Sequence, residues 1–352
     1  MQLTKYKLGD LIVQRREKNQ NYDVPIRGVS REGFINAKQQ EADTSIYNVF
    51  YKKDFVFNPA RMELNSIALN LEYDKALCSS LYEVFYVKDE SIVLPEFLNL
   101  HIKREEFARH CEYIGSGSAR EYCRFAHISE FNIELPPLNV QEEIVKADRL
   151  IKRKIALNNR LIKALEDTAQ AIYHHTFVEN IDPENLPEGW RWGTIADIAE
   201  ISSGKTINEK VDNPTEEYVI PVAGATGVIG YASKANYKDK LMTTGRVGTL
   251  GVVNRYYNPI WAADNVIVVK SKYFEFTFQI LNHLDYNELT KLGVQSLITK
   301  TGLENYKIVI PSDTAILEFQ KKADPIAQQI KLVSQEIDLL IKTKNLLLSK
   351  LS

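Results

Sequence analysis

The segment from Leu138 to Phe177 constrains the fold most, because it has the pattern of one long amphipathic helix in the middle of the chain. Apolar residues recur along it at the heptad spacing of a coiled coil. A stripe of this period needs a partner helix to cover it. The repeating positions are Ile144, Ile151, Asn158, Leu165 and Ile172, and Ala147, Ile155, Leu161 and Ala169 widen the stripe.

A second stripe of the same period lies at the far end of the chain. The simplest closed arrangement is an antiparallel coiled coil of the two helices. Asn158 and Lys344 are candidates for fixing its register, although a polar residue at a solvated edge is an equally good interpretation of both. We expect Pro325 to break the second helix near its start, with Asp324 as its cap. The second stripe consists of Ile316, Ala323, Ile330 and Ile337 in one seam, and Phe319, Ile326, Val333, Leu340 and Leu347 in the other.

Bulk composition indicates an ordinary globular protein. A chain of 352 residues with 44% hydrophobic residues is long enough for about two domains. The sequence has no apolar run of membrane-spanning length and no signal peptide, and its three cysteines form no CxxC pair. We therefore expect a cytoplasmic protein with free thiols and no zinc site. A net charge of −2 gives no argument for or against nucleic acid.

The order of segments predicts an internal repeat. FNIELPPL at Phe131 parallels YKIVIPSD at Tyr306, and LGDL at Leu8 parallels IADI at Ile195. The predicted fold class is α+β, with two mixed α/β domains separated by the two long helices. The predicted segments are 1–137 (first domain), 138–180 (first helix), 181–311 (second domain) and 312–352 (second helix). Within the domains, 94–111 and 274–284 have helical periodicity.

Two glycine-rich patterns suggest phosphate chemistry but lack its context. Ala199–Thr206, AEISSGKT, satisfies a loose phosphate-loop pattern. The stretch before it favours a helix over a strand, and INEKVDNP after it is a poor helix, so a nucleotide site is disfavoured. GATGVIG and GRVGTLG have GxxGxxG spacing and are better explained as tight turns. We find no catalytic triad or nuclease core, and His174-His175 lacks a third metal ligand.

The absence of a catalytic constellation favours a scaffold or a reader, and for a reader the useful residues are polar and basic ones in the predicted loops. Arginine and lysine pair with guanine or phosphate, and asparagine and glutamine pair with adenine. For any single residue, a solvated surface position is the commoner explanation. The candidates in the first domain are Arg27, Ser30, Arg31, Arg61, Asn65, Ser79, Ser80, Ser116, Ser118 and Arg120. Those in the second are Lys205, Thr206, Thr226, Arg246, Thr249, Gln295, Ser296, Thr299 and Lys300.

Several motifs resemble one known family in order and duplication. They are FNIELPPLNVQEEIV before the first long helix, LPEGWRWGTIADIAEISSGKT at the start of the second domain, then GATGVIGY, GRVGTLG and WAADNVIVV. FVFNPARMELNSIALN and SSLYEVFYV match a second style of domain in the same family. Over essentially its whole length, the chain resembles the DNA-specificity subunit of type I restriction–modification systems. The junction IPSDTAILEF departs from the pattern, because it lacks the Pro-Pro and Gln-Glu of LPPLNVQEE.

The resemblance implies a division of labour among subunits. Each domain would be a target-recognition domain that reads one half of a split site in double-stranded DNA. The helix pair would be the conserved spacer that docks methyltransferase subunits, which bring S-adenosylmethionine and methylate adenine. A restriction/translocase subunit is a further possible partner. The chain itself would bind no cofactor and perform no catalysis.

Two alternatives come from other functional classes. One is a coiled-coil scaffold that assembles partner proteins and binds no DNA. The other is an enzyme that uses the Gly204-Lys205-Thr206 loop.

Overall fold

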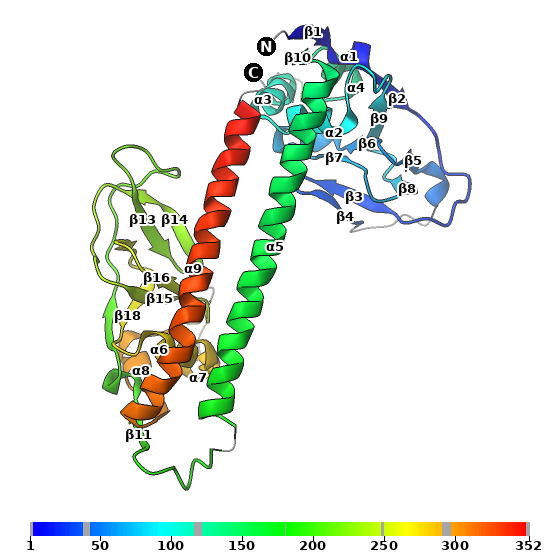
Figure 1. Cartoon of the computed structure of the whole chain (residues 1–352). Helices are drawn as coiled ribbons and strands as arrows, with labels where there is room; N and C mark the ends of the chain where they lie inside the picture. The colour runs from blue at the N-terminus through cyan, green and yellow to red at the C-terminus, as the bar shows by residue number, and fades with distance from the viewer. Residues whose placement is uncertain are drawn as a thin grey trace. The chain divides into compact units, whose positions relative to one another are not determined.

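The structure, a computed structural model, describes residues 3–37, 43–115, 122–179, 181–247, 250–290 and 297–349. Its contacts divide the chain into two compact units: unit 1 comprises Met1–Leu157 and Ile337–Ser352, and unit 2 comprises Asn158–Glu336. Each of the two long helices, α5 (Leu138–Phe177) and α9 (Asp313–Ser349), contributes one part to each unit (Figure 1). The fold class is α+β, as predicted.

The globular part of unit 1 mixes short strands and helices. Its strands are β1 (Thr4–Lys7), β2 (Ile12–Arg15), β3 (Arg27–Ser30), β4 (Gly33–Asn36), β5 (Asn48–Tyr51), β6 (Phe55–Phe57), β7 (Ile67–Leu69), β8 (Lys75–Cys78), β9 (Glu83–Val87) and β10 (Asn132–Leu135). Its helices are α1 (Leu8–Leu11), η1 (Thr44–Ile46), η2 (Pro59–Leu64), α2 (Pro95–Ile102), α3 (Glu105–Gly115) and α4 (Phe125–Ser129).

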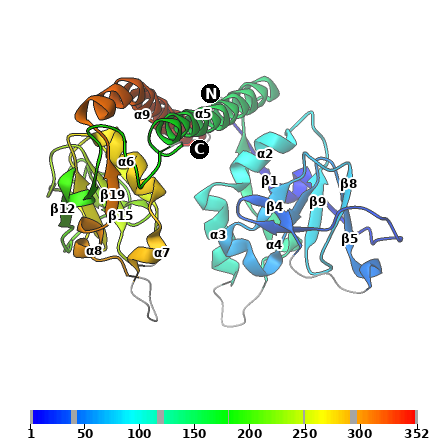
Figure 2. The same ribbon diagram turned by 90° about the horizontal axis from the view of Figure 1, so that it is seen from below.

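A four-stranded sheet of order β2-β9-β6-β7 forms the centre of unit 1. Residues alternate between its two faces, as strand geometry requires. Phe55 and Phe57 of β6 enter the core shared with α1 to α4, whereas Val56 enters a second core shared with β3, β5 and β8. Helices α2, α3 and α4 therefore cover one face (Figure 2), and the small β3-β4 and β5-β8 sheets cover the other.

Unit 2 is built from many short strands. Its strands are β11 (Arg191–Thr194), β12 (Glu200–Ser203), β13 (Ile220–Gly224), β14 (Gly227–Ala232), β15 (Leu241–Gly245), β16 (Val253–Tyr256), β17 (Trp261–Ala262), β18 (Val266–Lys270) and β19 (Lys307–Ile310). Its helices besides α5 and α9 are η3 (Ile195–Asp197), α6 (Phe274–His283), α7 (Tyr286–Leu289) and α8 (Lys300–Glu304).

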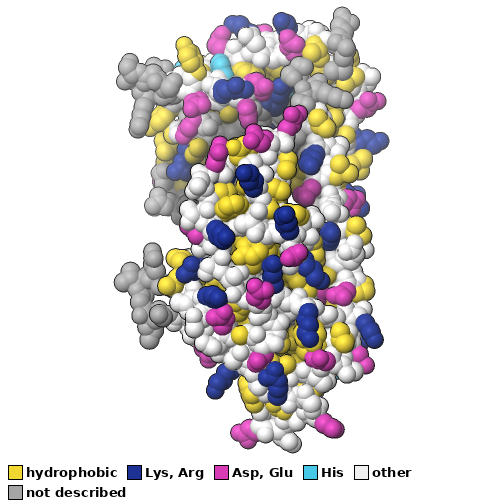
Figure 3. All heavy atoms as spheres, turned by 90° about the vertical axis from the view of Figure 1, so that its left-hand side faces the viewer, with side chains coloured by type: hydrophobic (Ala, Val, Ile, Leu, Met, Phe, Trp, Pro, Cys, Tyr) yellow, Lys and Arg dark blue, Asp and Glu magenta, His cyan; other side chains and the backbone are white. Residues whose placement is uncertain are grey.

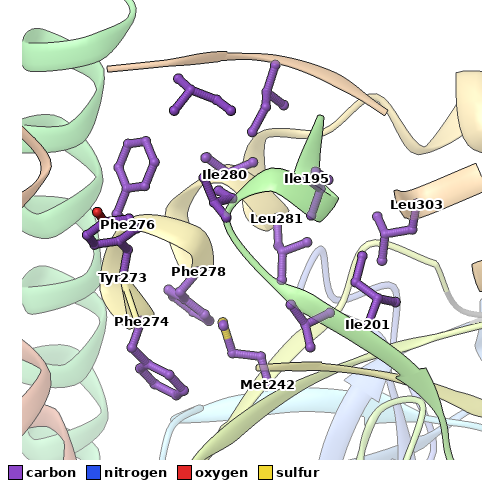
Figure 4. Close-up of a cluster of buried hydrophobic side chains, with 14 of the residues drawn as sticks. Ile195, Ile201, Met242, Tyr273, Phe274, Phe276, Phe278, Ile280, Leu281 and Leu303 are labelled. Atoms are coloured by element: carbon purple, nitrogen blue, oxygen red, sulfur yellow. The ribbon is translucent and has the colours of Figure 1, made fainter. Parts of the chain in front are cut away.

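The sheet β12-β18-β15-β16 lies between two cores in unit 2. Met242 on one face contributes to a large apolar cluster with α6 and the long helices, part of which is drawn in Figure 4. Leu241, the next residue, points to the opposite face and packs with strands of the β14-β13-β17 sheet. Both units thus place helices on one face of a four-stranded sheet and further strands on the other.

The predicted internal repeat is present in the strand pairing. β1 pairs antiparallel with β10, so that Thr4 faces Leu135, and β11 pairs antiparallel with β19, so that Arg191 faces Ile310. In each unit the first strand leads into one helical turn, and its partner strand leads into a long helix. This pairing joins the start of each domain to the junction at which α5 or α9 begins.

The two junctions differ in one buried residue. Gln141 in the first turn of α5 is fully buried, and its amide nitrogen donates to the Ile92 carbonyl at 2.9 Å and the Pro136 carbonyl at 3.0 Å. In α9, the apolar Ile316 is buried in the core of unit 2. The second junction, IPSDTAILEF, therefore has an apolar residue, Ile316, at the position where LPPLNVQEE has the buried polar residue Gln141.

Within each unit the two long helices contribute to one apolar core. In unit 2, Tyr173 and Phe177 share a core with Ile316 and Phe319, and in unit 1 Leu347 packs on the core that contains Ile144. The two helices therefore pair antiparallel. Of the expected seam residues, Ile144, Asn158, Ile330 and Val333 are buried, and Ile151, Leu165, Ile172, Ile326, Ile337, Leu340 and Leu347 are half-buried.

Three local predictions are wrong. Pro325 does not break the second helix, which continues from Asp313 to Ser349 because Ala323, Ala327 and Ile330 hold it in the core on both sides. The helical periodicity of 94–111 is confirmed, although it belongs to two helices, α2 and α3, which a break at Lys103 and Arg104 separates. Leu161 is 42% exposed, and the neighbouring Ile162 is half-buried in its place. The stretch before Ser203 ends in a strand, β12, and not in a helix.

None of the helices in the described part of the chain has both the length and the apolar composition needed to cross a bilayer.

Candidate nucleic-acid interface

A cleft of about 920 Å³ opens in unit 1 between four loop regions. They are the β3–β4 turn, η2, the break between α2 and α3, and the β8–β9 turn. These regions are far apart in sequence and converge because β3, β7 and β8 lie close together in the fold. The cleft brings together the predicted residues Arg27, Ser30, Arg31, Arg61, Asn65 and Ser79.

The arginines of the cleft are of two kinds. Arg27 is fixed: its guanidinium lies 4.9 Å from the ring centre of Tyr73, and its Nε donates to the Tyr73 hydroxyl at 2.9 Å. The guanidiniums of Arg31 and Arg61 have no hydrogen-bond or ion-pair partner within the described residues. Arg31 and Arg61 are therefore available to bind an anionic ligand.

Other predicted residues in the cleft are used to build its walls. Asn65 is 7% exposed, adopts a left-handed conformation at the end of η2 (φ 54°), and donates from Nδ2 to the Ile102 carbonyl at 2.9 Å. Ser30 Oγ donates to the Gly33 carbonyl at 3.2 Å within the β3–β4 turn. Ser79 Oγ accepts from the Leu81 amide at 3.2 Å. These side chains shape the loops and are poor candidates for base contacts. Ser80 is half-buried and does not line the cleft.

The sequence did not indicate Lys103, whose side chain links three of the segments that line the cleft. Its Nζ donates to the carbonyl oxygens of Ile67 at 2.6 Å, Arg31 at 2.9 Å and Asn65 at 3.4 Å. Burial lowers the pKa of Lys103 to about 8. Lys103 therefore ties η2 and β7 to the turn that presents Arg31. Its role depends on contacts distant in sequence, and no local pattern indicates it.

In unit 2, Lys205, Thr206 and Arg246 meet at the turn between β17 and β18. Thr206 Oγ1 donates to the Asp264 carboxylate at 2.9 Å. The Arg246 guanidinium donates to the Asp264 carbonyl at 3.5 Å, and the Lys205 amide donates to the Ala262 carbonyl at 2.9 Å. This turn is the candidate site of the second domain.

The remaining predicted residues of unit 2 lie in other settings. Thr226 lies in the turn between β13 and β14. Thr299 caps α8, since its Oγ1 accepts from the Gly302 amide at 3.0 Å, and Lys300 pairs with Glu304 at 3.3 Å on the same helix. Ser116, Ser118, Arg120, Thr249, Gln295 and Ser296 fall outside the described residues.

The loop around Gly204 does not have the geometry of a phosphate cradle. A strand does precede it, but no helix follows Thr206. A Cβ on Gly204 would lie 1.9 Å from the Ala263 carbonyl oxygen, and the Trp261 indole donates to the Lys205 carbonyl at 3.0 Å. The loop is therefore packed against β17. A phosphate-binding loop would instead point its backbone amides toward a ligand.

An ion-pair network with a buried Arg255–Glu275 pair and a half-exposed Glu166 joins the second domain to α5. Arg255 on β16 donates to Glu275 on α6 at 2.9 Å, and its guanidinium also lies 3.5 Å from Glu166 on α5. Glu275 is 3% exposed and also accepts from the Tyr257 hydroxyl at 3.1 Å. Burial raises the pKa of Glu275, and the Arg255 guanidinium opposes that rise. The network fixes the β-sheet to the helix within unit 2.

The face of the protein drawn in Figure 3 carries side chains of both charges. On the face drawn in Figure 3, lysine and arginine side chains alternate with aspartate and glutamate over the described surface. Among the described residues, no group of three or more His, Cys, Asp and Glu side chains is placed to hold a metal ion. The candidate interface is therefore defined by local groups in the cleft and the β17–β18 turn.

Comparison with known proteins gives a consistent result. The family model described as "Type I restriction modification DNA specificity domain" matches residues 2–167 and 187–344. A specificity subunit of the type I restriction enzyme EcoprrI from Escherichia coli is 24% identical over 135 residues, which are 37% of this chain and 33% of that protein.

Two solved structures extend over nearly the whole chain. The type I restriction–modification S subunit from M. genitalium has 16% identity and a TM-score of 0.62, with 99% of this chain and 96% of that chain covered. The HsdS subunit from Thermoanaerobacter tengcongensis has 19% identity and a TM-score of 0.43, with 99% and 96% covered. The first of these likenesses supports the fold. Because the family model matches both halves of the repeat, the chain belongs to the family of type I restriction–modification DNA specificity proteins.

Proposed function

We propose that this chain is a sequence-specific DNA-binding subunit that recognises a two-part site in duplex DNA and directs methyltransferase subunits to it. The observation that carries the proposal is the duplication: β1–β10 leading into α5 and β11–β19 leading into α9 present two domains on equivalent supports. A protein with two separate reading domains suits a site with two separate half-sites.

The cleft of unit 1 supports the DNA-binding role. Arg31 and Arg61 carry guanidiniums that no described group neutralises, and arginine suits both phosphate and the guanine edge. In the second domain, Lys205, Thr206 and Arg246 meet at one turn. Each domain thus places basic side chains on loops that a sheet supports.

We further propose that the long helices dock the partner subunits. Exposed leucines recur along both long helices, although an exposed apolar stripe is costly unless a partner covers it. Methyltransferase subunits that carry S-adenosylmethionine are the proposed occupants, and a restriction/translocase subunit is a further one. The exposed positions are Leu150, Leu157 and Leu161 on α5, and Leu332, Leu339 and Leu346 on α9.

A domain exchange tests the DNA-binding proposal. The chain is purified with its methyltransferase partner, and the preferred duplex is selected from a random library. Replacing residues 4–135 by the matching domain of a relative should change one half-site, and replacing residues 191–310 should change the other. Specific binding with both half-sites unchanged after either exchange would contradict the proposal.

A point substitution tests the docking face. Leu339 is 63% exposed, and Leu339→Glu should weaken assembly with the methyltransferase, as measured by sedimentation. Val219→Glu is the matched control, because Val219 is 54% exposed but lies outside the helices. Equal effects of the two substitutions would remove the argument for this face.

A further inference from the structure

The cleft of unit 1 is lined by both basic side chains and exposed apolar side chains. Beside the available guanidiniums of Arg31 and Arg61, it is lined by three large apolar side chains that remain exposed to solvent. Leu81 is 77% exposed, Leu64 is 59% exposed and Ile35 is 38% exposed. Single exposed apolar side chains are common on protein surfaces, but three around one cleft form a patch.

The turn that carries Leu81 is held rigidly. The Tyr82 amide donates to the Ser79 carbonyl at 3.0 Å, which closes the turn. Asn48, which is 9% exposed, donates from Nδ2 to the carbonyls of Ser79 at 3.3 Å and Tyr82 at 2.7 Å. The side chain of Leu81 is thus presented to solvent from a fixed backbone, and a fixed position is what a specific contact needs.

The charged residues of the cleft indicate which kind of ligand fits it. Arg27, Arg31, Arg61, Lys103 and Arg104 line it, against the two carboxylates of Glu63 and Glu105. An anionic ligand with an apolar group therefore fits better than an apolar peptide. In the major groove of DNA, the C5-methyl group of thymine is the apolar group that base pairs present.

We infer that Leu81 is a specificity residue that contacts the C5-methyl group of one thymine in the half-site read by the first domain, while Arg31 and Arg61 bind beside it. The inference rests on the proposed function. It predicts that this half-site contains at least one A·T pair, and that one of its thymines is read through its methyl group.

Deoxyuridine scanning tests the inference directly. In the selected duplex, each thymine of the first half-site is replaced in turn by deoxyuridine, which keeps base pairing and lacks only the methyl group. With the chain in complex with its methyltransferase, we expect one replacement to weaken binding about fourfold, as for burial of one methylene-sized group. In the Leu81→Ala variant, the same replacement should have no effect.

The controls separate the possible results. Leu71→Ala removes another exposed leucine of unit 1, outside the cleft, and should keep the deoxyuridine effect. An equal effect in wild type and Leu81→Ala, or a first half-site without thymine, overturns the inference and leaves the proposed function intact. Absence of any preferred site for the complex would instead overturn the proposed function.

Discussion

Asn158 on α5 donates from its side-chain Nδ2 to a carboxylate oxygen of Glu336 on α9 at 2.8 Å. Asn158 is 4% exposed and occupies a position of the seam where the neighbouring layers hold isoleucine and leucine. A buried polar residue in a helix seam favours the one alignment that satisfies its hydrogen bond. The contact therefore favours a register-fixing role for Asn158 over a position at a solvated edge of the helix pair.

Removing this donor should destabilise the helix pair. We expect Asn158→Ala to lower the free energy of unfolding by about 1–3 kcal/mol, because a half-buried carboxylate loses a charge-assisted hydrogen bond. Urea unfolding followed by circular dichroism measures the loss. Asn159→Ala is the matched control, since Asn159 is exposed on the same helix and should change stability by less than about 0.5 kcal/mol.

His101 should make unit 1 sensitive to acid. Burial, together with the nearby Arg104 guanidinium, lowers the pKa of His101 to about 4, below its ordinary value of 6.5. The unfolded chain therefore takes up a proton between pH 6.5 and 4 while the folded protein does not, so stability falls as pH falls through this range. The loss approaches about 3 kcal/mol near pH 4.

The substitution His101→Phe should remove this acid-dependent loss, as measured by thermal unfolding between pH 7 and 4. Its aromatic ring replaces a histidine whose ring centre lies 5.0 Å from that of Phe97. His175→Gln, at an 80% exposed side chain, is the control and should retain the loss. A wild-type stability that stays flat between pH 6.5 and 4 would contradict the assignment.

Arg61 should contribute to DNA affinity through a phosphate. Replacing it by alanine is expected to weaken binding of the selected duplex about tenfold and to reduce the slope of log affinity against log salt by about one. Arg16→Ala serves as control, because Arg16 is an exposed residue of unit 1 that lies outside the cleft. An unchanged salt slope in Arg61→Ala would exclude a phosphate contact.

Gly204→Ala should destabilise unit 2 and should not change nucleotide binding. The added Cβ would lie 1.9 Å from the Ala263 carbonyl oxygen, so the β12 end or the β17–β18 turn must shift. We expect a loss of about 1–3 kcal/mol in unfolding free energy. Calorimetry with ATP and GTP provides the second measurement: heat of binding that Lys205→Ala abolishes would revive the nucleotide-site alternative.

The periodic parts of this fold could be predicted from the sequence. A heptad pattern depends on the geometry of one helix, so the stripe from Ile144 to Ile172 identified both α5 and the kind of partner it needs. The repeat of FNIELPPL and YKIVIPSD likewise identified equivalent strands, because apolar residues at matching positions take part in the same antiparallel pairing in β10 and β19. Pro325 misled the prediction, because tertiary packing around Ala323 and Ala327 outweighs the local preference of proline.

The candidate site could be predicted only in part. Residue type suggested Arg31 and Arg61 but could not distinguish them from Arg27. The Arg27 guanidinium is held by Tyr73, which lies in the loop between β7 and β8. Lys103 and Leu81 were missed for the same reason. The role of Lys103 depends on carbonyls in η2, β7 and the β3–β4 turn, and that of Leu81 on a turn that Asn48 holds.

The sequence predicts two domains separated by the long helices, so the length of α5 and α9 should set the distance between the two half-sites. Inserting one heptad into each helix, between residues 157 and 158 and between 336 and 337, adds about 10.5 Å of helix and keeps the seam in phase. The preferred gap between half-sites should then grow by roughly three base pairs, with the half-sites unchanged. Methylation mapping with the partner methyltransferase measures the gap. A heptad inserted in α5 alone breaks the pairing register and should abolish specific methylation, whereas an unaltered gap with both insertions would mean that the helices do not set the separation.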